Sequence, residues 1–376
     1  MRSHRASPGK FCIPDNETLD TIPEKCIYVS NTVSLRRHRR KRGDTGANMT
    51  HGIPDRIRQD GGPDRAPATA TAQPQQAAAG AIPVEFACSD GVRLRGEFWP
   101  ARPGTASRTV IVNPATGVLA SYYHRYARFL TRHGLNALTY DYRGIGASRP
   151  ASLRGCGYRW RDWGEYDFDA AVRFLRARDP DGRIAVVGHS IGGFLPGLAA
   201  SAGAVERILT VGAQYAYWPD YAARQRLRLF VKWHLAMPLV TALCGYFPGR
   251  RLGWLEDLPA GVANEWSFRR ARMEASYPAS RRAEILARFD AVTAPLLAIA
   301  THDDIYATPP AVRRGLSYYR NAPKTLVHLG PDYFTAGPTG HFGLFHSAHE
   351  VRFWRDTVSW LVDGANPWRS PADGNA

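Results

Sequence analysis

Cysteine and lysine are scarce in this chain, and each shortage excludes a class of protein. Five cysteines are scattered over 376 residues without a C-x-x-C pair, so the sequence predicts neither a disulfide framework nor a paired-cysteine metal site. A reducing compartment is expected instead. Only five of the 49 basic residues are lysines. The net charge of +16 therefore comes mainly from arginine. GC-rich coding produces arginine without any functional demand, so this charge does not predict a nucleic-acid partner.

Long hydrophobic runs and ligand-binding motifs are also missing. The N-terminus shows no apolar core of a signal peptide, and the most hydrophobic stretch, 233–247, contains His234 and Pro238. We expect this stretch to be too short and interrupted for a membrane span of roughly 20 residues, and the protein to be cytoplasmic. No dinucleotide or phosphate-loop motif follows the first predicted strand, and no histidine and cysteine cluster has metal spacing. We therefore expect no cofactor and no metal.

The two ends of the chain differ from its body. Residues 1–82 lack apolar periodicity and contain a stretch rich in proline, glycine, alanine and glutamine, which predicts a disordered tail. The arginine-rich run 36–42 is a nucleic-acid patch, a localisation signal or a plain solvated segment. Whether residues 1–48 belong to the native protein is left open, since Met49 could serve as the start. Residues 366–376 are predicted to be a flexible C-terminus.

From residue 83 onward, signals for strands and helices alternate. Strands are predicted over 84–88, 92–99, 109–113, 135–140, 183–187, 205–211, 295–300 and 325–329. Helices are predicted over 120–133, 165–178, 311–321 and 351–361, with another directly after Gly188. This alternation implies an α/β fold with a mostly parallel sheet and helices on both faces. The first two strands add an antiparallel hairpin at one edge.

One motif points to nucleophilic catalysis. Gly188-His189-Ser190-Ile191-Gly192 matches G-x-S-x-G at the junction of a predicted strand and a predicted helix. In that context the motif is typical of a nucleophile elbow, where glycines allow a tight turn and the serine stands exposed above the sheet. A plain glycine-rich turn is the alternative interpretation.

Over residues 83–365 the chain resembles serine hydrolases of the α/β-hydrolase fold. It is similar to an uncharacterised bacterial group near the serine aminopeptidase-like and esterase branches. The resemblance rests on four stretches: Pro114-Ala115-Thr116-Gly117-Val118, Asp141-Tyr142-Arg143-Gly144-Ile145-Gly146, Gly188-His189-Ser190-Ile191-Gly192-Gly193 and Gly340-His341-Phe342-Gly343. It implies the fold and a Ser–Asp–His triad. It implies no substrate, because members of this superfamily cleave many kinds of bond.

A serine nucleophile needs a general base, and histidine is the usual one. In an α/β-hydrolase the histidine follows the acid, on a loop between the last strand and the last helix. His341 meets both conditions, whereas His346 and His349 stand where the final helix is predicted to begin. The side chain of His189 is expected to point away from Ser190, because neighbours on such a turn diverge. His341 is therefore the predicted base.

Two neighbouring aspartates follow the strand predicted over 295–300. By chemistry alone, either Asp303 or Asp304 could orient the imidazole and stabilise its charged form. The family's G-x-x-D-x-x-V-P-like loop places Asp304 on the acid, although Thr301 stands where the family has glycine. The remaining aspartate is expected to cap a turn or a helix.

Two backbone amides should hold the oxyanion. One is predicted to be that of Ile191, directly after the nucleophile, and the other should come from the loop after the strand over 109–113. Many relatives carry His-Gly in that loop, which this chain lacks. Pro114 has no amide hydrogen, so Ala115 or Thr116 must donate, and Thr116 is favoured.

A long insertion is predicted between the strands over 205–211 and 295–300. It divides the hydrolase core into 83–213 and 285–365. Residues 214–284 hold four of the ten tryptophans and are predicted to form a helical lid with an apolar acyl pocket over the strand ends. A helical hairpin with its own aromatic core is the alternative. Its arginines are either an exposed face or an attraction for acidic substrates: Arg224, Arg226, Arg228, Arg250, Arg251, Arg269, Arg270 and Arg272.

These observations favour a serine hydrolase that acts on carboxylic esters or thioesters of apolar acyl groups. An acyltransferase on the same fold is a second interpretation. A non-catalytic protein that binds nucleic acid or an anionic surface is a third. The expected partner is a small-molecule acyl ester, with weak contact between the arginines and an anionic surface left open. Acyl length, leaving group and oligomeric state are not predicted.

Overall fold

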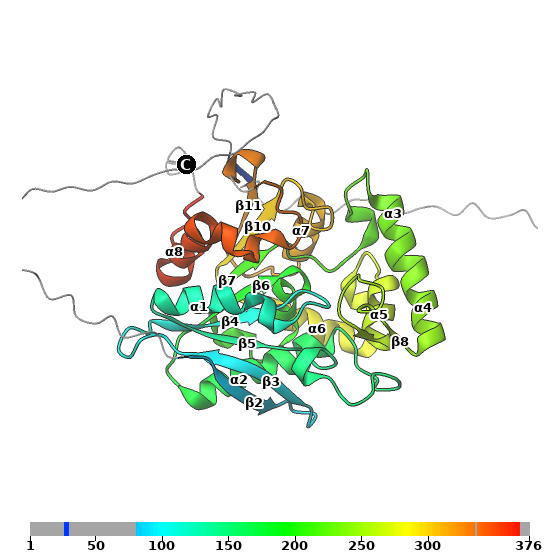
Figure 1. Ribbon diagram of the computed structural model, residues 1–376, viewed down its shortest axis with the longest axis horizontal. Coiled ribbons are helices and arrows are strands. Elements are labelled where there is room, and N and C mark those ends of the chain that lie inside the picture. The colour runs from blue at the N-terminus through cyan, green and yellow to red at the C-terminus, as the bar shows by residue number, and fades with distance from the viewer. Residues whose placement is uncertain (1–25, 30–79, 335–336, 369–376) are drawn as a thin grey trace, which may run out of the picture. The chain divides into compact units, whose positions relative to one another are not determined.

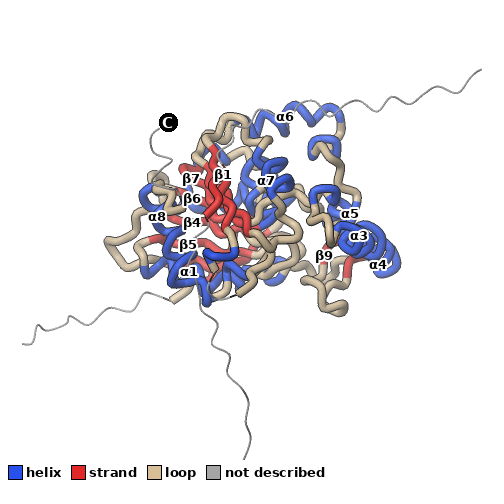
Figure 2. The backbone as a smooth tube through the Cα atoms, turned by 90° about the horizontal axis from the view of Figure 1, so that it is seen from above, coloured by secondary structure: helices blue, strands red, loops and turns tan. Residues whose placement is uncertain are grey.

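The fold is built on one mixed β-sheet, as Figures 1 and 2 show. The computed structural model describes residues 26–29, 80–334 and 337–368. Within these ranges the sheet has nine strands in the order β1-β11-β10-β7-β6-β4-β5-β3-β2. They are β1 (Cys26–Val29), β2 (Ile82–Ala87), β3 (Arg93–Trp99), β4 (Arg108–Asn113), β5 (Leu135–Tyr140), β6 (Ile184–His189), β7 (Val205–Val211), β10 (Leu296–Thr301) and β11 (Lys324–Leu329).

The pairing of these strands confirms the predicted fold class. Neighbours from β1 to β5 in the sheet order run parallel, whereas β3 is antiparallel to β5 and β2 is antiparallel to β3. Every strand predicted in the body is present, and β5 and β7 match their predictions at both ends. Gly134 directly precedes β5 and Gly212 directly follows β7, and glycine at a strand end is a boundary that the sequence shows.

Helices cover both faces of the sheet. They are α1 (His124–Arg132), α2 (Asp169–Arg178), α3 (Arg226–Phe230), α4 (Met237–Cys244), α5 (Ala260–Ser267), α6 (Ala279–Asp290), α7 (Pro309–Leu316) and α8 (Arg355–Asp363). Side chains alternate across a strand. Val110 and Val112 of β4 therefore share a core with α1 and α8, whereas Ile111 shares one with α2, α6 and α7.

The predicted helix after Gly188 is wrong. The chain instead makes two short 3₁₀ turns, Ser190–Gly193 and Leu195–Leu198. Gly192 has a high entropic cost in a helix, and Pro196 lacks the N–H that a helix interior needs. Such a segment favours short 3₁₀ pieces over a regular α-helix.

The predicted tails are wrong where partners far along the chain order them. β1 lies within segment 1–82 and pairs in parallel with β11, and β2 begins at Ile82. Trp368, in the predicted flexible C-terminus, is only 4% exposed and packs on Phe353. Local composition does not reveal such long-range partners. Residues 1–25, 30–79 and 369–376, including the arginine-rich run 36–42, lie outside the described residues.

Between β7 and β10 the chain forms a helical insertion, whose helices α3, α4 and α5 lie at the right of Figure 1. It also contains a small sheet of β8 (Tyr246–Phe247) and β9 (Leu258–Pro259). α3, the π-helical turn Val231–Ala236 and α4 form one continuous helical run. The boundary predicted at residue 284 falls inside α6, because that helix continues to Asp290 with Phe289 buried in the core.

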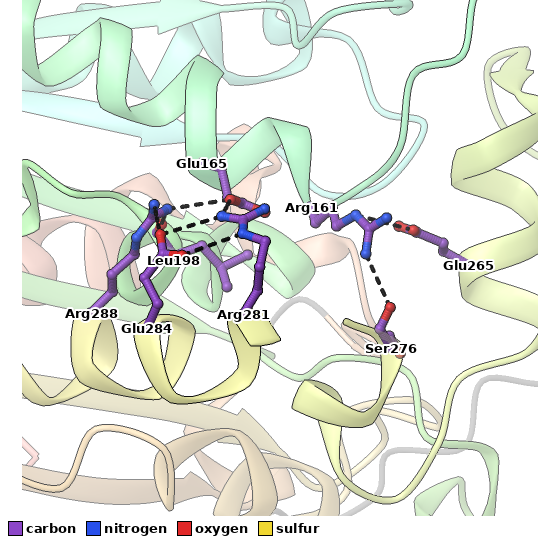
Figure 3. Close-up of polar contacts among 8 residues, drawn as sticks. All are labelled: Arg161, Glu165, Leu198, Glu265, Ser276, Arg281, Glu284 and Arg288. Carbon is purple, nitrogen blue, oxygen red and sulfur yellow. Dashed lines mark hydrogen bonds and ion pairs between the residues drawn. The ribbon is translucent and has the colours of Figure 1, made fainter. Parts of the chain in front are cut away.

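Ion pairs fasten part of the insertion to the core, as Figure 3 shows. The carboxylate of Glu165, just before α2, is nearly buried and lies 2.6 Å from Arg281 Nη2 and 3.3 Å from Arg288 Nη1 of α6. Arg161 Nε on the core side lies 3.4 Å from Glu265 of α5. Partly buried charges are screened less than exposed ones, so these contacts hold α5 and α6 against the core.

A buried ion pair joins the end of β5 to the hairpin turn. Arg143 Nε lies 2.6 Å from Asp167 Oδ1, and Arg143 Nη1 lies 2.5 Å from Asp90 Oδ2. Asp167→Ala would leave a buried guanidinium without its main partner, so we expect the free energy of unfolding to fall by about 3–5 kcal/mol. Urea denaturation measures this loss. Glu85→Ala, which breaks exposed ion pairs, should cost far less, and equal losses would contradict the prediction.

Candidate active site

Ser190 stands on a strained turn at the end of β6. Its φ is +55°, in the left-handed region that residues with a side chain rarely adopt. The glycines around it are required by close backbone contacts. A Cβ on Gly188 would lie 2.3 Å from Gly193 Cα, and a Cβ on Gly192 would lie 2.3 Å from the carbonyl oxygen of Asn113. The turn therefore has the geometry expected of an elbow that presents one serine.

The structure brings Ser190, His341 and Asp304 together. Ser190 Oγ lies 2.8 Å from His341 Nε2, and His341 Nδ1 lies 2.7 Å from Asp304 Oδ2. The other oxygen of Asp304 accepts the amides of Tyr306 and Ala307, each at 2.8 Å. Such a line of hydrogen bonds can move a proton from a serine hydroxyl to an imidazole and stabilise the resulting charge.

The surroundings of Asp304 keep it ionised. Burial alone would raise the pKa of this carboxyl group. The charge and hydrogen bond of His341, followed by the amides of Ala307 and Tyr306, outweigh burial and hold the pKa of Asp304 below its ordinary value. An ionised carboxylate at this position can only accept a hydrogen bond, which favours a proton on His341 Nδ1.

Asp303 has a different place. Its oxygens accept the amides of Thr339 and Gly340 at 2.7 Å and 2.8 Å, and the hydroxyl of Thr339 at 2.9 Å. It therefore ties down the loop that leads into His341, and its carboxylate is occupied there.

The two residues predicted to hold the oxyanion lie at the cavity beside Ser190. Thr116 and Ile191 both line this cavity. The amide of Ala115 donates to Tyr123 Oη at 3.0 Å, so it is already used, whereas the Thr116 amide makes no hydrogen bond to any described residue. This difference favours Thr116 over Ala115 as the second candidate donor.

The sequence did not indicate how His189 is used. Its ring is fully buried and bridges two functional loops. Burial, followed by the charge of His341, lowers the pKa of His189 to about 3, so the ring is neutral. Its Nε2–H donates to the carbonyl oxygen of His341 at 2.8 Å, and Tyr123 Oη–H donates to its Nδ1 at 2.7 Å. Because Tyr123 also binds Ala115, His189 links the Thr116 loop to the His341 loop.

This link makes a prediction for His189→Phe, which keeps ring volume and loses both hydrogen bonds. We expect kcat/KM on a short ester to fall about tenfold, because a net hydrogen bond of about 1 kcal/mol is lost at each loop. His133→Phe, at an exposed position beyond α1, is the control. Steady-state kinetics measure both variants, and equal rates for His189→Phe and wild type would contradict the link.

A cavity of about 170 Å³ opens beside Ser190 and His341. Three tryptophans, a tyrosine and a phenylalanine line it, and the tryptophans come from the insertion. Trp233 stacks on Trp266 at 4.6 Å between ring centres, and Trp233 Nε1 donates to Tyr306 Oη at 3.2 Å. The other large side chains that line it are Trp254, Leu255, Phe342, Lys232 and Arg269.

Side chains that could bind a metal ion do not cluster in the described part of the chain. Among these residues no group of three or more histidine, cysteine, aspartate or glutamate side chains is placed to hold a metal ion. The acidic and histidine side chains at the cavity bind one another instead.

Comparisons with known proteins extend these observations. Residues 98–352 match the family described as the alpha/beta hydrolase family. No curated protein matches the sequence.

Several solved structures are similar in fold. A soluble variant of monoglyceride lipase from Saccharomyces cerevisiae has a TM-score of 0.54 and 14% identity, over 77% of this chain and 97% of that one. An esterase from Pyrococcus furiosus has a TM-score of 0.51 and 18% identity, over 78% and 95%. The alpha/beta hydrolase GrgF from Penicillium sp. sh18 has a TM-score of 0.50 and 19% identity, over 76% and 100%. At such identities the likeness shows the fold alone.

Proposed function

The chain belongs to the alpha/beta hydrolase family, and from this premise we propose that it is a serine hydrolase that cleaves carboxylic esters or thioesters of apolar acyl groups. The observation that carries the proposal is the line of hydrogen bonds from Ser190 Oγ through His341 to Asp304. The aromatic cavity beside Ser190 supports an apolar acyl group.

In the first half of the proposed reaction, Ser190 Oγ bonds to the substrate carbonyl carbon while His341 Nε2 takes its proton. Asp304 keeps His341 Nδ1 protonated and stabilises the imidazolium. The carbonyl oxygen becomes an oxyanion, which accepts hydrogen bonds from the amides of Ile191 and Thr116. His341 then gives the proton to the leaving alcohol or thiol as its bond to carbon breaks, and an acyl ester on Ser190 remains.

The second half reverses these roles with water. His341 Nε2 takes a proton from a water molecule, whose oxygen bonds to the acyl carbon. The bond between that carbon and Ser190 Oγ then breaks, His341 returns the proton to the serine, and the carboxylic acid leaves. An acceptor other than water would give acyl transfer by the same steps.

We assign two further properties to this proposed hydrolase. The insertion acts as a lid that sets acyl preference, supported by the three tryptophans that it contributes to the cavity. The protein works in the cytoplasm, supported by three free cysteines among the described residues, Cys88, Cys156 and Cys244, as a reducing compartment maintains them.

A fluorophosphonate probe tests the proposal directly, because it reacts covalently with activated serines. We expect labelling of wild type at Ser190, no labelling of Ser190→Ala, and full labelling of the control Ser201→Ala. Peptide mapping by mass spectrometry identifies the labelled residue. A folded wild type without label, or with label on another residue, would refute the serine mechanism.

The lid assignment predicts a change in acyl preference for Trp254→Ala. Each buried methylene contributes about 0.8 kcal/mol, so removing this aromatic wall should lower kcat/KM for an octanoate ester about tenfold and leave an acetate ester within about twofold. Trp218→Ala is the matched control, because Trp218 lies in the insertion but does not line the cavity. A series of p-nitrophenyl esters measures the preference, and equal losses on both esters would indicate a structural role instead.

A further inference from the structure

Two cations line the cavity of the candidate active site, and neither forms an ion pair with a described residue. Arg269, just after α5, is only 6% exposed, and its Nε and Nη1 atoms are buried without a hydrogen-bond partner in the described part of the chain. Its guanidinium carbon lies 4.1 Å from the ring centre of Trp160. The charge of the neighbouring Glu265 acts on Arg269, but Glu265 forms no ion pair with it. Glu265 Oε1 lies 3.4 Å from Arg161 and 3.5 Å from Arg159, and Glu265 Oε2 has no hydrogen-bond partner among the described residues.

Lys232 is held in a similar setting. Its Nζ lies 4.4 Å and 4.3 Å from the ring centres of Trp233 and Trp254. Burial, followed by the charge of Arg228, lowers the pKa of Lys232, and burial lowers the pKa of Arg269 to about 10. Aromatic faces attract cations but offer no strong hydrogen-bond acceptor, so the buried Nε–H and Nη1–H groups of Arg269 remain without a hydrogen-bond partner in the described part of the chain.

We propose that this cavity takes an ester or thioester that carries an anionic group, a carboxylate or a phosphate, and that Arg269 binds this group with Lys232 beside it. The proposal rests on the proposed hydrolase function. A guanidinium donates paired hydrogen bonds to carboxylate or phosphate oxygens, and such a ligand supplies the acceptors that Arg269 lacks. The tryptophans then pack on the carbon atoms between the anionic group and the ester.

Two pairs of substrates test the proposal and distinguish the side of the ester that carries the charge. The first compares the p-nitrophenyl monoester of adipic acid with p-nitrophenyl hexanoate, and the second compares hexanoyl glycerol phosphate with hexanoyl glycerol. We expect kcat/KM of wild type to favour the anionic member of one pair by about tenfold or more. Arg269→Met should abolish this preference and Lys232→Met should reduce it. Arg270→Met, at an exposed position, should preserve it.

A preference in the first pair assigns the anion to the acyl side, and one in the second pair assigns it to the alcohol side. No preference in either pair overturns the proposal, and so does a preference that survives both Arg269→Met and Lys232→Met. If Arg269→Met does not fold, the anionic preference of Lys232→Met is compared with that of wild type instead, because Lys232 is only half-buried. If wild type cleaves no ester and takes no fluorophosphonate, the proposed function itself has failed.

An independent observation concerns the outer face of the helical run Arg226–Cys244. This run of 19 residues is long and apolar enough to cross a membrane, by length and composition alone. Only 28% of its apolar window is buried in the protein, so most of that window is exposed. The buried side chains of the run are Leu229, Trp233, His234, Met237 and Thr241. The opposite face exposes apolar side chains at a spacing of four, with exposed fractions of 47% to 78%: Leu227, Val231, Leu235, Leu239 and Leu243.

The geometry of the run keeps these five side chains together. Side chains four residues apart do not line up exactly on an α-helix, because it has 3.6 residues per turn. The wider π-helical turn Val231–Ala236 in the middle of the run offsets this drift and keeps the five side chains on one face. In Figures 1 and 2, α5 lies between α4 and the sheet, so the helical run lies at the outer side of the insertion. The exposure of the five side chains agrees with this position.

The charge around the stripe identifies its occupant. No aspartate or glutamate occurs from 221 to 255, and exposed arginines stand before the helical run, in its first turn and after it. They are Arg224, Arg228, Arg250 and Arg251. We infer that this stripe, defined as the five apolar side chains from Leu227 to Leu243, rests on the surface of an anionic phospholipid bilayer. An amphipathic helix of this kind binds through buried apolar area and attraction to anionic headgroups.

Vesicle sedimentation of the full chain tests this inference. Wild type should bind vesicles of phosphatidylcholine mixed with phosphatidylglycerol more strongly than vesicles of phosphatidylcholine alone. Replacing Leu227, Leu235 and Leu239 together by glutamine should weaken binding about tenfold or more. The control Val351→Gln removes an equally exposed apolar side chain outside the stripe and should bind like wild type.

Two results would overturn the inference. One is binding that the triple variant leaves unchanged, which would assign membrane affinity to another part of the chain. The other is absent vesicle binding together with a dimer that the triple variant dissociates in analytical ultracentrifugation, which would assign the stripe to a second copy of the chain. Hydrolysis of a soluble short ester by the triple variant serves as the check on folding.

Discussion

Ser190→Ala is expected to lower the rate of ester hydrolysis by a factor on the order of 10⁶, and His341→Ala by a similar factor. Ser190 Oγ and His341 Nε2 are 2.8 Å apart. Ser190 needs His341 to take its proton, and His341 has no nucleophile to activate without Ser190. For the same reason the double variant should be no slower than either single variant. The rate that remains comes from binding and from the amides that hold the oxyanion.

Stopped-time assays on a p-nitrophenyl ester measure these losses, and intact-protein mass spectrometry detects the acyl-enzyme. His346→Ala is the matched control, because His346 lies exposed on the same loop and caps only a local turn. Activity of Ser190→Ala within tenfold of wild type would show that another group attacks the carbonyl. Additive losses in the double variant would show that the two residues act separately.

The strands of the core could be predicted because their own residues and the residues that flank them indicate a strand. β5 (LNALTY) and β7 (VERILTV) lie inside a sheet covered on both faces, and each combines apolar residues with a few polar ones. Gly134 directly before β5 and Gly212 directly after β7 mark one end of each strand. By contrast, β1 depends on pairing with β11, and Trp368 depends on packing against Phe353. β11 is far from β1 in sequence, and Phe353 lies in the preceding helical segment rather than beside Trp368, so the local pattern around β1 and Trp368 does not reveal these contacts.

The candidate site shows the same division. The elbow was visible because Gly188 and Gly192 are required by backbone contacts that any such turn makes. The relay from Ala115 through Tyr123 to His189 was not visible, because a ring can bridge two loops only after the sheet has brought them together. Arg269 was predicted only as one of eight arginines of the insertion, because burial distinguishes it from exposed Arg270 and sequence does not. Lys232 was not predicted to take part in the site.

The two neighbouring aspartates give the sharpest comparison. Asp304→Asn is expected to lower kcat on the order of 10⁴-fold, whereas Asp303→Asn should cost about tenfold or less. The asparagine at 304 would keep its carbonyl oxygen toward the amides of Tyr306 and Ala307, which Asp304 Oδ1 accepts now. Its NH₂ group would then face His341 Nδ1, which would have to lose its proton to accept.

That change of tautomer would place the remaining proton of His341 on Nε2, where it blocks proton transfer from Ser190. Asparagine at 303 instead retains one acceptor for the Thr339 and Gly340 amides and leaves the tautomer of His341 alone. Steady-state kinetics on one ester, with thermal melting to confirm folding, compare the two variants. If Asp303→Asn loses as much kcat as Asp304→Asn, loop position and not the tautomer controls the rate, and Asp304 is not the acid partner that the geometry supports.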